Sequence, residues 1–219
     1  MTTSGDGWTG AVLFAVVLVL ATMLASTRLG EIRLTRPPRT AVVLWLLIAV
    51  PSLLQIAVPA VLDALERDPD QIRDHQWWRI FTSVAVQDGG VAGTAVNLLV
   101  LAWVAPLAVR VWGGVRAVLL FVASQIIFGL FTAFLFPSPG AGNSGATLAL
   151  AASFAGLVVM QSKQWRVLAA SGGIVLAGVL LVVVDDAHGL AVLTGALLGA
   201  ALATVSPPPG DPPGAVRTL

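Results

Sequence analysis

The chain has no cysteine, and only 11% of its 219 residues are charged. The lack of cysteine excludes disulfides and thiolate metal sites. Typical soluble domains have roughly a quarter of their residues charged, so this chain does not have the composition of a water-exposed domain. Its formal net charge of +1 gives no basic surface for nucleic acid. With only two histidines and no phosphate-binding loop, no metal or other cofactor is implied.

What the chain has instead is apolar sequence, at 57% hydrophobic residues. Several runs approach the ~20 residues that cross a bilayer as a helix. Helices are expected because backbone groups in lipid must find partners within their own segment. The sequence therefore predicts an all-α polytopic membrane helix bundle. Its spans are expected over residues 8–27, 40–62, 91–109, 115–136, 144–162, 167–184 and 187–205.

Two features refine these spans. Pro51 and Pro59 predict kinks in the second span, and the short third and fifth spans predict helices held by protein neighbours rather than lipid. The segment before the first span carries Asp6 and no basic residue, so we expect a membrane helix there rather than a cleavable signal peptide.

Charge in the loops predicts the orientation. Basic residues gather after the first, third and fifth spans, and acidic residues gather in the alternate loops. The basic set is Arg28, Arg33, Arg36, Arg39, Arg110, Arg116, Lys163 and Arg166. By the positive-inside rule these loops are cytoplasmic, which puts the N-terminus outside and the C-terminus inside. The fifth and seventh spans then both begin at the outer face. Ser144 is the first residue of the fifth span, and His188 is the second residue of the seventh.

Ser144 and His188 are the residues best suited to covalent chemistry. A serine hydroxyl is a weak nucleophile until a base within hydrogen-bond reach takes its proton. Histidine suits that role because its ordinary pKa lies near physiological pH. The alternative for Ser144 is a helix N-cap, a position that serine often fills. Small residues along both spans, including Gly145 and Gly195, would allow the two helices to approach closely.

Four features of the sequence resemble the rhomboid family of intramembrane serine proteases. Gly142-Asn143-Ser144-Gly145 matches the family's GxSG motif, and Ala187-His188 with Ala191 and Gly195 resembles its alanine-histidine helix. Trp78-Arg79 resembles the Trp-Arg motif of its long outer loop, and Asn97 falls where the family has an asparagine. The resemblance divides the chain into an extra N-terminal helix and basic loop over 1–39, a six-helix domain over 40–205 and a disordered Pro-rich tail over 206–219.

The resemblance implies a serine endopeptidase that cleaves transmembrane segments with a Ser144–His188 dyad. The oxyanion would be held by the Asn97 amide and by the backbone N–H groups of Ser144 and Gly145, which are free at a helix start. The implied partners are transmembrane protein substrates and the lipid bilayer, and the expected location is a bacterial plasma membrane. Cofactors, metals and nucleic acid are not implied, and the oligomeric state is not predicted.

The chain departs from the family at two positions. A histidine commonly found four residues before the asparagine is replaced by Gly93, and another just upstream by Gln87. These changes favour an alternative, a catalytically inactive rhomboid-like protein that binds transmembrane helices. A small-molecule channel is a third interpretation. An ion-coupled carrier is disfavoured, since no charged residue lies near the middle of a span.

Asp185 and Asp186 precede His188 and offer a further choice. Asp185 lies three residues before the histidine and would face it in a helix, which suggests a Ser-His-Asp triad. The alternative is that both acids cap the last helix at the outer face. The family resemblance itself implies a dyad without an acid.

Overall fold

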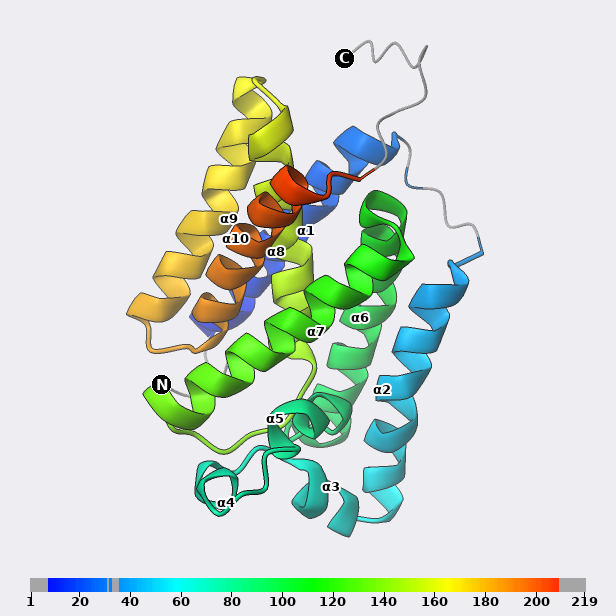
Figure 1. Ribbon diagram of the computed structural model, residues 1–219, viewed down its shortest axis with the longest axis vertical. Helices are drawn as coiled ribbons and strands as arrows, with labels where there is room; N and C mark the ends of the chain where they lie inside the picture. Colours follow the sequence, from blue (N-terminus) through cyan, green and yellow to red (C-terminus); the bar gives the residue numbers. More distant parts are fainter. Residues whose placement is uncertain (1–7, 31, 33–35, 209–219) are drawn as a thin grey trace.

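The computed structural model describes residues 8–30, 32 and 36–208. Within these residues seven helices are long and apolar enough to cross a membrane, as predicted (Figure 1). The elements are α1 (Trp8–Leu29), α2 (Arg39–Ala57), α3 (Ala60–Leu65), α4 (Pro69–Arg73), α5 (Arg79–Thr82), η1 (Ser83–Ala85), α6 (Gly90–Trp112), α7 (Gly114–Leu130), η2 (Phe131–Leu135), α8 (Ser144–Gln161), α9 (Trp165–Val183) and α10 (His188–Val205).

Helix α8 is the centre of the bundle. Of its apolar window 78% is buried inside the protein, compared with 28–44% for the other six membrane helices. Helices α1, α6, α7, α9 and α10 all pack against it, and α2 lies outside α6. The prediction that the fifth span is held by protein neighbours is therefore confirmed.

Helices α8 and α10 meet backbone to backbone, which the small residues of both helices permit. A Cβ on Gly195 would lie 2.1 Å from the carbonyl oxygen of Ala149, and one on Gly199 would lie 2.1 Å from that of Ser153. Only glycine fits at these positions. The close contact holds the start of α10 beside the start of α8, where the candidate catalytic residues lie.

Several predicted boundaries differ from the structure. The second span ends at Ala57 rather than at residue 62, because proline at position 59 cannot continue the hydrogen-bonded helix; α3 starts anew after it. Pro51 lies inside α2, as expected. The third span is not short: α6 runs for 23 residues and stops at Gly113, whose φ of +82° suits glycine. The predicted tail over 206–219 lies largely outside the described residues.

The long loop between α2 and α6 folds into α3, α4, α5 and η1 at the lower end of the bundle in Figure 1. Arg79 organises this region from a buried position, with only 5% of its surface exposed. Its Nη1 donates to the carbonyl oxygens of Asp63 and Glu66, both at 2.9 Å, and its Nε donates to Gln76 Oε1 at 2.8 Å. Trp77 and Trp78 are about half exposed, at 49% and 51%. Arg79 of the Trp-Arg pair thus holds the loop together.

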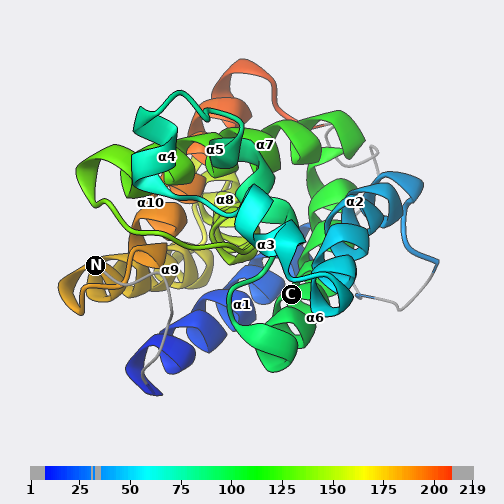
Figure 2. The same ribbon diagram turned by 90° about the horizontal axis from the view of Figure 1, so that it is seen from below.

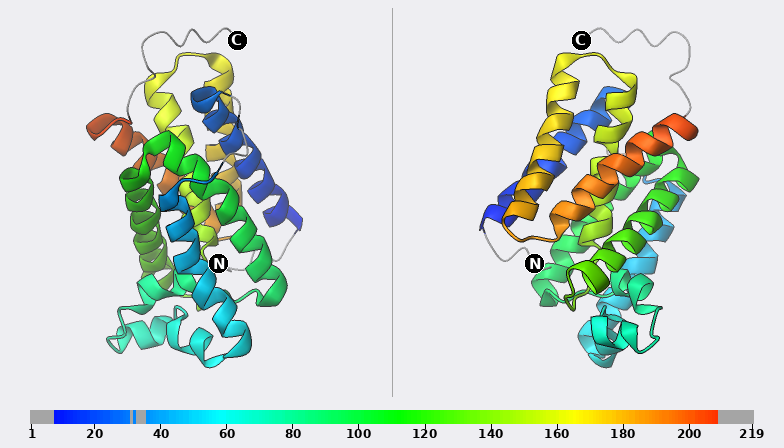
Figure 3. Two further views of the ribbon diagram at one scale, coloured as in Figure 1. Left: turned by 90° about the vertical axis from the view of Figure 1, so that its right-hand side faces the viewer. Right: turned by 60° about the vertical axis from the view of Figure 1, so that its left-hand side comes forward.

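Helix α1 packs onto α9, α8 and α6. In Figure 2 it lies between α9 and α6, and Figure 3 shows it running alongside α9. Its first turn is at the same end of the bundle as the start of α8, and its last turn is at the opposite end (Figure 1). This extra helix is therefore an integral part of the bundle and reaches the candidate site.

Candidate active site

The loop that precedes α8 is held in place by main-chain hydrogen bonds. The N–H of Arg67 donates to the carbonyl oxygen of Gly140 at 2.9 Å, and Gly140 donates back at 3.0 Å. Gly142 donates its N–H to the carbonyl oxygen of Ser83 at 2.9 Å. Burial lowers the pKa of Arg67 to about 10, although nearby Asp88 opposes the shift. These contacts fix the path of the chain as it enters α8.

Ser144 and His188 lie within hydrogen-bond reach of each other. Ser144 Oγ is 2.8 Å from His188 Nε2, although the two residues are 44 positions apart in the chain. The N-cap of α8 is Asn143, and Ser144 is the first helical residue. The N-cap interpretation of Ser144 is therefore wrong, because its hydroxyl faces the imidazole instead of capping the helix.

The second imidazole nitrogen contacts an acid. His188 Nδ1 lies 2.7 Å from Asp186 Oδ1, and the same oxygen accepts the backbone N–H of His188 at 2.9 Å. An ionised carboxylate only accepts hydrogen bonds, so in neutral His188 the proton sits on Nδ1. Nε2 then has the lone pair that accepts the Ser144 hydroxyl proton.

The acid that faces His188 is not Asp185, the residue that helical spacing suggested. Asp185 has a φ of +62° and is exposed, whereas Asp186 is buried. The N–H groups of Asp185 and Asp186 donate to the carbonyls of Val182 and Leu181, at 3.1 and 2.9 Å. This is a Schellman turn, in which the residue after the C-cap takes a left-handed conformation. The turn directs Asp185 outward and Asp186 inward.

Aromatic rings enclose the imidazole on two sides. The Phe14 ring of α1 lies 4.9 Å from it in an edge arrangement, and the Phe128 ring of α7 lies 5.7 Å away. Phe128 reaches this position because position 145 is glycine: a Cβ on Gly145 would lie 2.7 Å from Phe128 Cδ1. His188 is only 3% exposed as a result. The other histidine, His75, is exposed outside the site.

Asn97 is fixed beside Ser144 by Gln87. Asn97 Nδ2 donates to Gln87 Oε1 at 2.8 Å. The Gln87 amide nitrogen in turn donates to Ser52 Oγ at 3.1 Å and to Asn143 Oδ1 at 3.0 Å. With both of its N–H groups used, Gln87 orients Asn97 rather than facing a substrate itself. Asn97 keeps one N–H for another acceptor.

Gly142 leaves open a space between the candidate groups. A Cβ at this position would lie 3.2 Å from Gln87 Oε1, 3.4 Å from Asn97 Nδ2 and 3.5 Å from Ser144 Oγ. The φ of +149° also favours glycine. The space touches the candidate nucleophile and an amide donor, which an acyl oxyanion site requires, but it also borders the Gln87 acceptor oxygen to which Asn97 donates. Gly93, one turn before Asn97, has no atom within 4 Å of its Cβ direction, so the departure from the family leaves a gap there.

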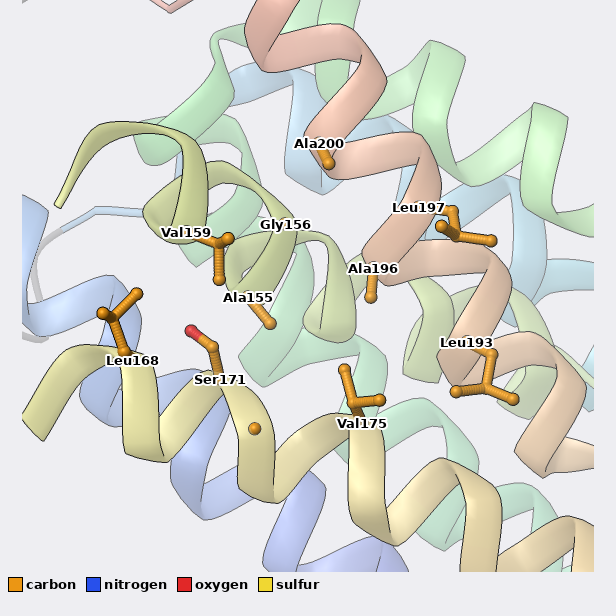
Figure 4. A pocket seen from close by; sticks show the side chains of 11 residues that line it. Ala155, Gly156, Val159, Leu168, Ser171, Val175, Leu193, Ala196, Leu197 and Ala200 are labelled. Atoms are coloured by element: carbon orange, nitrogen blue, oxygen red, sulfur yellow. The ribbon is translucent and has the colours of Figure 1, made fainter. Parts of the chain in front are cut away.

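A pocket of about 250 Å³ opens directly at Ser144. Helices α1, α6 and α8 line it, and its polar residues among largely apolar walls are Asn97, Asn143, Ser144 and Thr147. A larger apolar groove of about 560 Å³ lies between α8, α9 and α10 (Figure 4). It begins at Ala155, about 16 Å along α8 from Ser144 at 1.5 Å per residue, and has no part in this site.

A family model of the rhomboid domain matches residues 74–208, more than half of the chain and all of α6 to α10. The chain belongs to the rhomboid family. It is an integral membrane protein of that family, whose members are generally intramembrane serine proteases. Comparison with curated proteins gives no match.

The sequence does not predict the polar network around Asn97. It marks Gln87 only as the replacement of a histidine and Asn143 only as part of the GxSG motif, and it gives Ser52 no role. The polarity of Ser52 within an apolar span is a signal in the sequence, because polar side chains in such spans must find partners within the protein.

Within the described residues no cluster of three or more candidate metal ligands occurs.

Proposed function

We propose that this protein is an intramembrane serine endopeptidase with Ser144 as nucleophile and His188 as general base and acid. The observation that carries the proposal is the 2.8 Å contact between Ser144 Oγ and His188 Nε2. That distance is within the range at which a base removes a hydroxyl proton. The family supports the same reaction class.

In the acylation step, Ser144 Oγ attacks the scissile carbonyl carbon while its proton passes to His188 Nε2. The carbonyl oxygen becomes an oxyanion in the space that Gly142 leaves open, where the Asn97 amide and the N–H groups of Ser144 and Gly145 would donate to it. His188 then gives its proton to the leaving amine as the C–N bond breaks.

Deacylation uses the same groups in reverse roles. Water attacks the acyl-serine ester, His188 takes a proton from that water, and the proton returns to Ser144 as the acid product leaves. Asp186 acts as a positioning residue: it keeps the proton of neutral His188 on Nδ1 and stabilises the imidazolium formed in both steps.

The proposed substrate is a transmembrane segment of another protein that is partly unwound beside Ser144. Unwinding is required because a helical carbonyl is bonded to the N–H four residues later and is shielded from attack. We also propose that the site lies at the outer face of a bacterial plasma membrane, since the basic loops that follow α6 and α8 are at the opposite end of the bundle (Figure 1). A reporter fused after α10 should give a cytoplasmic signal; an external signal would contradict this orientation.

The test is cleavage of a single-span substrate in liposomes by wild type, Ser144→Ala and His188→Ala. Only wild type should release product, and a fluorophosphonate should label wild type but not Ser144→Ala. If wild type releases no more product than the two variants across a panel of substrates, the protease proposal is wrong.

A second candidate function is the binding of transmembrane helices without cleavage. Gly93 favours it, because the family commonly has a histidine donor at that position. This function predicts capture of a single-span protein by wild type and by Ser144→Ala alike, with no fluorophosphonate labelling of either.

A further inference from the structure

The pocket at Ser144 has one wall that lies outside the matched rhomboid domain. Helix α1 ends at Leu29, well before the match begins at residue 74. Nevertheless four of its residues line the pocket opposite α6. They are Ala11, Phe14, Ala15 and Leu18. Their spacing of three and four residues puts them on one face of the helix.

The pocket lies between α1 and α6, with Ser144 on its floor. Val96, Asn97 and Val100 of α6 form the second wall. Because α1 lies between α6 and α9 (Figure 2), α1 rather than α9 faces α6 across this opening. A substrate that enters between these walls meets Ser144 and Asn97 together.

The wall that α1 provides is anchored by its C-terminal half. Trp103 Nε1 of α6 donates to Thr22 Oγ1 at 3.0 Å. On the α9 side, Leu20 packs so closely that a Cβ on Gly173 would lie 2.8 Å from its Cδ1. Val17, Ala21, Leu24 and Ala25 are buried along the same half. These contacts make α1 a fixed wall of the pocket.

The N-terminal half of α1 leaves room beside Ser144. Ala11 and Ala15 are exposed, and their methyl groups are the smallest side chains on this wall. Phe14 lies between them in sequence and packs against the His188 ring. The pocket has a volume of about 250 Å³. A helix of ~10 Å diameter fills about 120 Å³ per residue at 1.5 Å rise, so the pocket holds about two residues and not a whole helix.

We propose that α1 and α6 form the substrate groove of this protein and that Ala11 and Ala15 determine which residues fit beside the scissile bond. The occupant is an unwound apolar stretch of a membrane protein, because no charged side chain lines the pocket. The inference rests on the proposed function and assigns the extra N-terminal helix a direct role in substrate recognition.

The first test compares substrates that differ only in the residue beside the scissile bond, alanine or phenylalanine. Ala15→Leu narrows the groove, so the ratio of kcat/KM for the alanine substrate to that for the phenylalanine substrate should rise at least tenfold. Val12→Leu is the matched control, since Val12 is 51% exposed on α1 and does not line the pocket. Equal ratios in wild type and both variants would overturn the proposal.

The second test does not require catalysis. A photoreactive benzoylphenylalanine replaces Ala15 or Val12 in the Ser144→Ala background, and a single-span test protein is added in liposomes. Cross-linking from position 15 and not from position 12 supports the groove, even if wild type cleaves nothing and the protease proposal fails. Equal cross-linking from both positions, or none from position 15, contradicts the groove whatever the activity.

Discussion

Replacement of Asp186 by asparagine would isolate the contribution of its charge. A single oxygen, Asp186 Oδ1, accepts both His188 Nδ1–H at 2.7 Å and the His188 backbone N–H at 2.9 Å. Asparagine can present its own oxygen at the same place and so keep both hydrogen bonds and the tautomer of His188. What it removes is the negative charge beside the imidazolium that forms during catalysis.

The size of the effect can be bracketed. A hydrogen bond to a charged group exceeds a neutral one by about 1 kcal/mol, which sets the lower limit. Two unit charges about 4 Å apart interact by ~4 kcal/mol at an effective dielectric constant of 20, which sets the upper limit. At about 1.36 kcal/mol per factor of ten, Asp186→Asn should lower kcat by roughly 5-fold to 10³-fold. Asp186→Ala should lower it further, because it also leaves two N–H groups of His188 without their acceptor.

The assay is single-span substrate cleavage in liposomes with kcat and KM determined separately. We expect kcat to fall and KM to stay near the wild-type value, since Asp186 does not line the substrate pocket. Asp185→Asn is the control: the side chain is exposed, and asparagine tolerates its φ of +62°. A kcat for Asp186→Asn within twofold of wild type, or an equal loss in Asp185→Asn, would refute the assignment.

Three further substitutions test other parts of the site and bundle. Gly93→His supplies a donor one turn before Asn97, in open space. It should raise kcat for cleavage about tenfold or more, since one oxyanion donor is typically worth ~10²–10³ in rate. Gly93→Ala, assayed in parallel, should leave kcat unchanged. Gly142→Ala places a methyl group between Asn97 and Ser144 and should lower kcat/KM by ~10²-fold or more in the same assay, and unchanged cleavage would contradict the placement of the oxyanion. Gly195→Val forces α10 away from α8 and should destabilise the fold by about 3 kcal/mol, measured by thermal unfolding in detergent, whereas the exposed Leu197→Val should have little effect.

Apolar run length and loop charge predicted the helices and the common end of Ser144 and His188, whereas their pairing as a dyad was implied by the resemblance to the rhomboid family. Seven spans followed from hydropathy, and the charge pattern put Ser144 and His188 at one end of the bundle. Both predictions rest on bulk properties of lipid and water, which act on any sequence in the same way. Helix ends were less certain, because a residue such as Pro59 can kink a helix or stop it.

Which acid lies beside His188 depends on a local conformation that spacing does not reveal. Asp185 satisfied the helical three-residue spacing, but the chain at that point is a Schellman turn, and the turn exchanges the roles of the two acids. Asparagine, aspartate and glycine all enter the left-handed region, so the sequence Asp185-Asp186 does not say which residue does so. The Gln87 network likewise depends on contacts between α2, α6 and α8 that only the packed bundle brings together.

The position of α8 also bears on how the protein is made. Most of α8 is covered by other helices, and it makes close backbone contacts with Gly195 and Gly199 of α10, which leaves the ribosome after α8. His188 and Asp186 arrive with that same stretch. During synthesis α8 is therefore inserted before α10, and Ser144 lacks its proposed base until α10 docks. A growing chain should be unable to cut other newly inserted membrane proteins until its own bundle is complete.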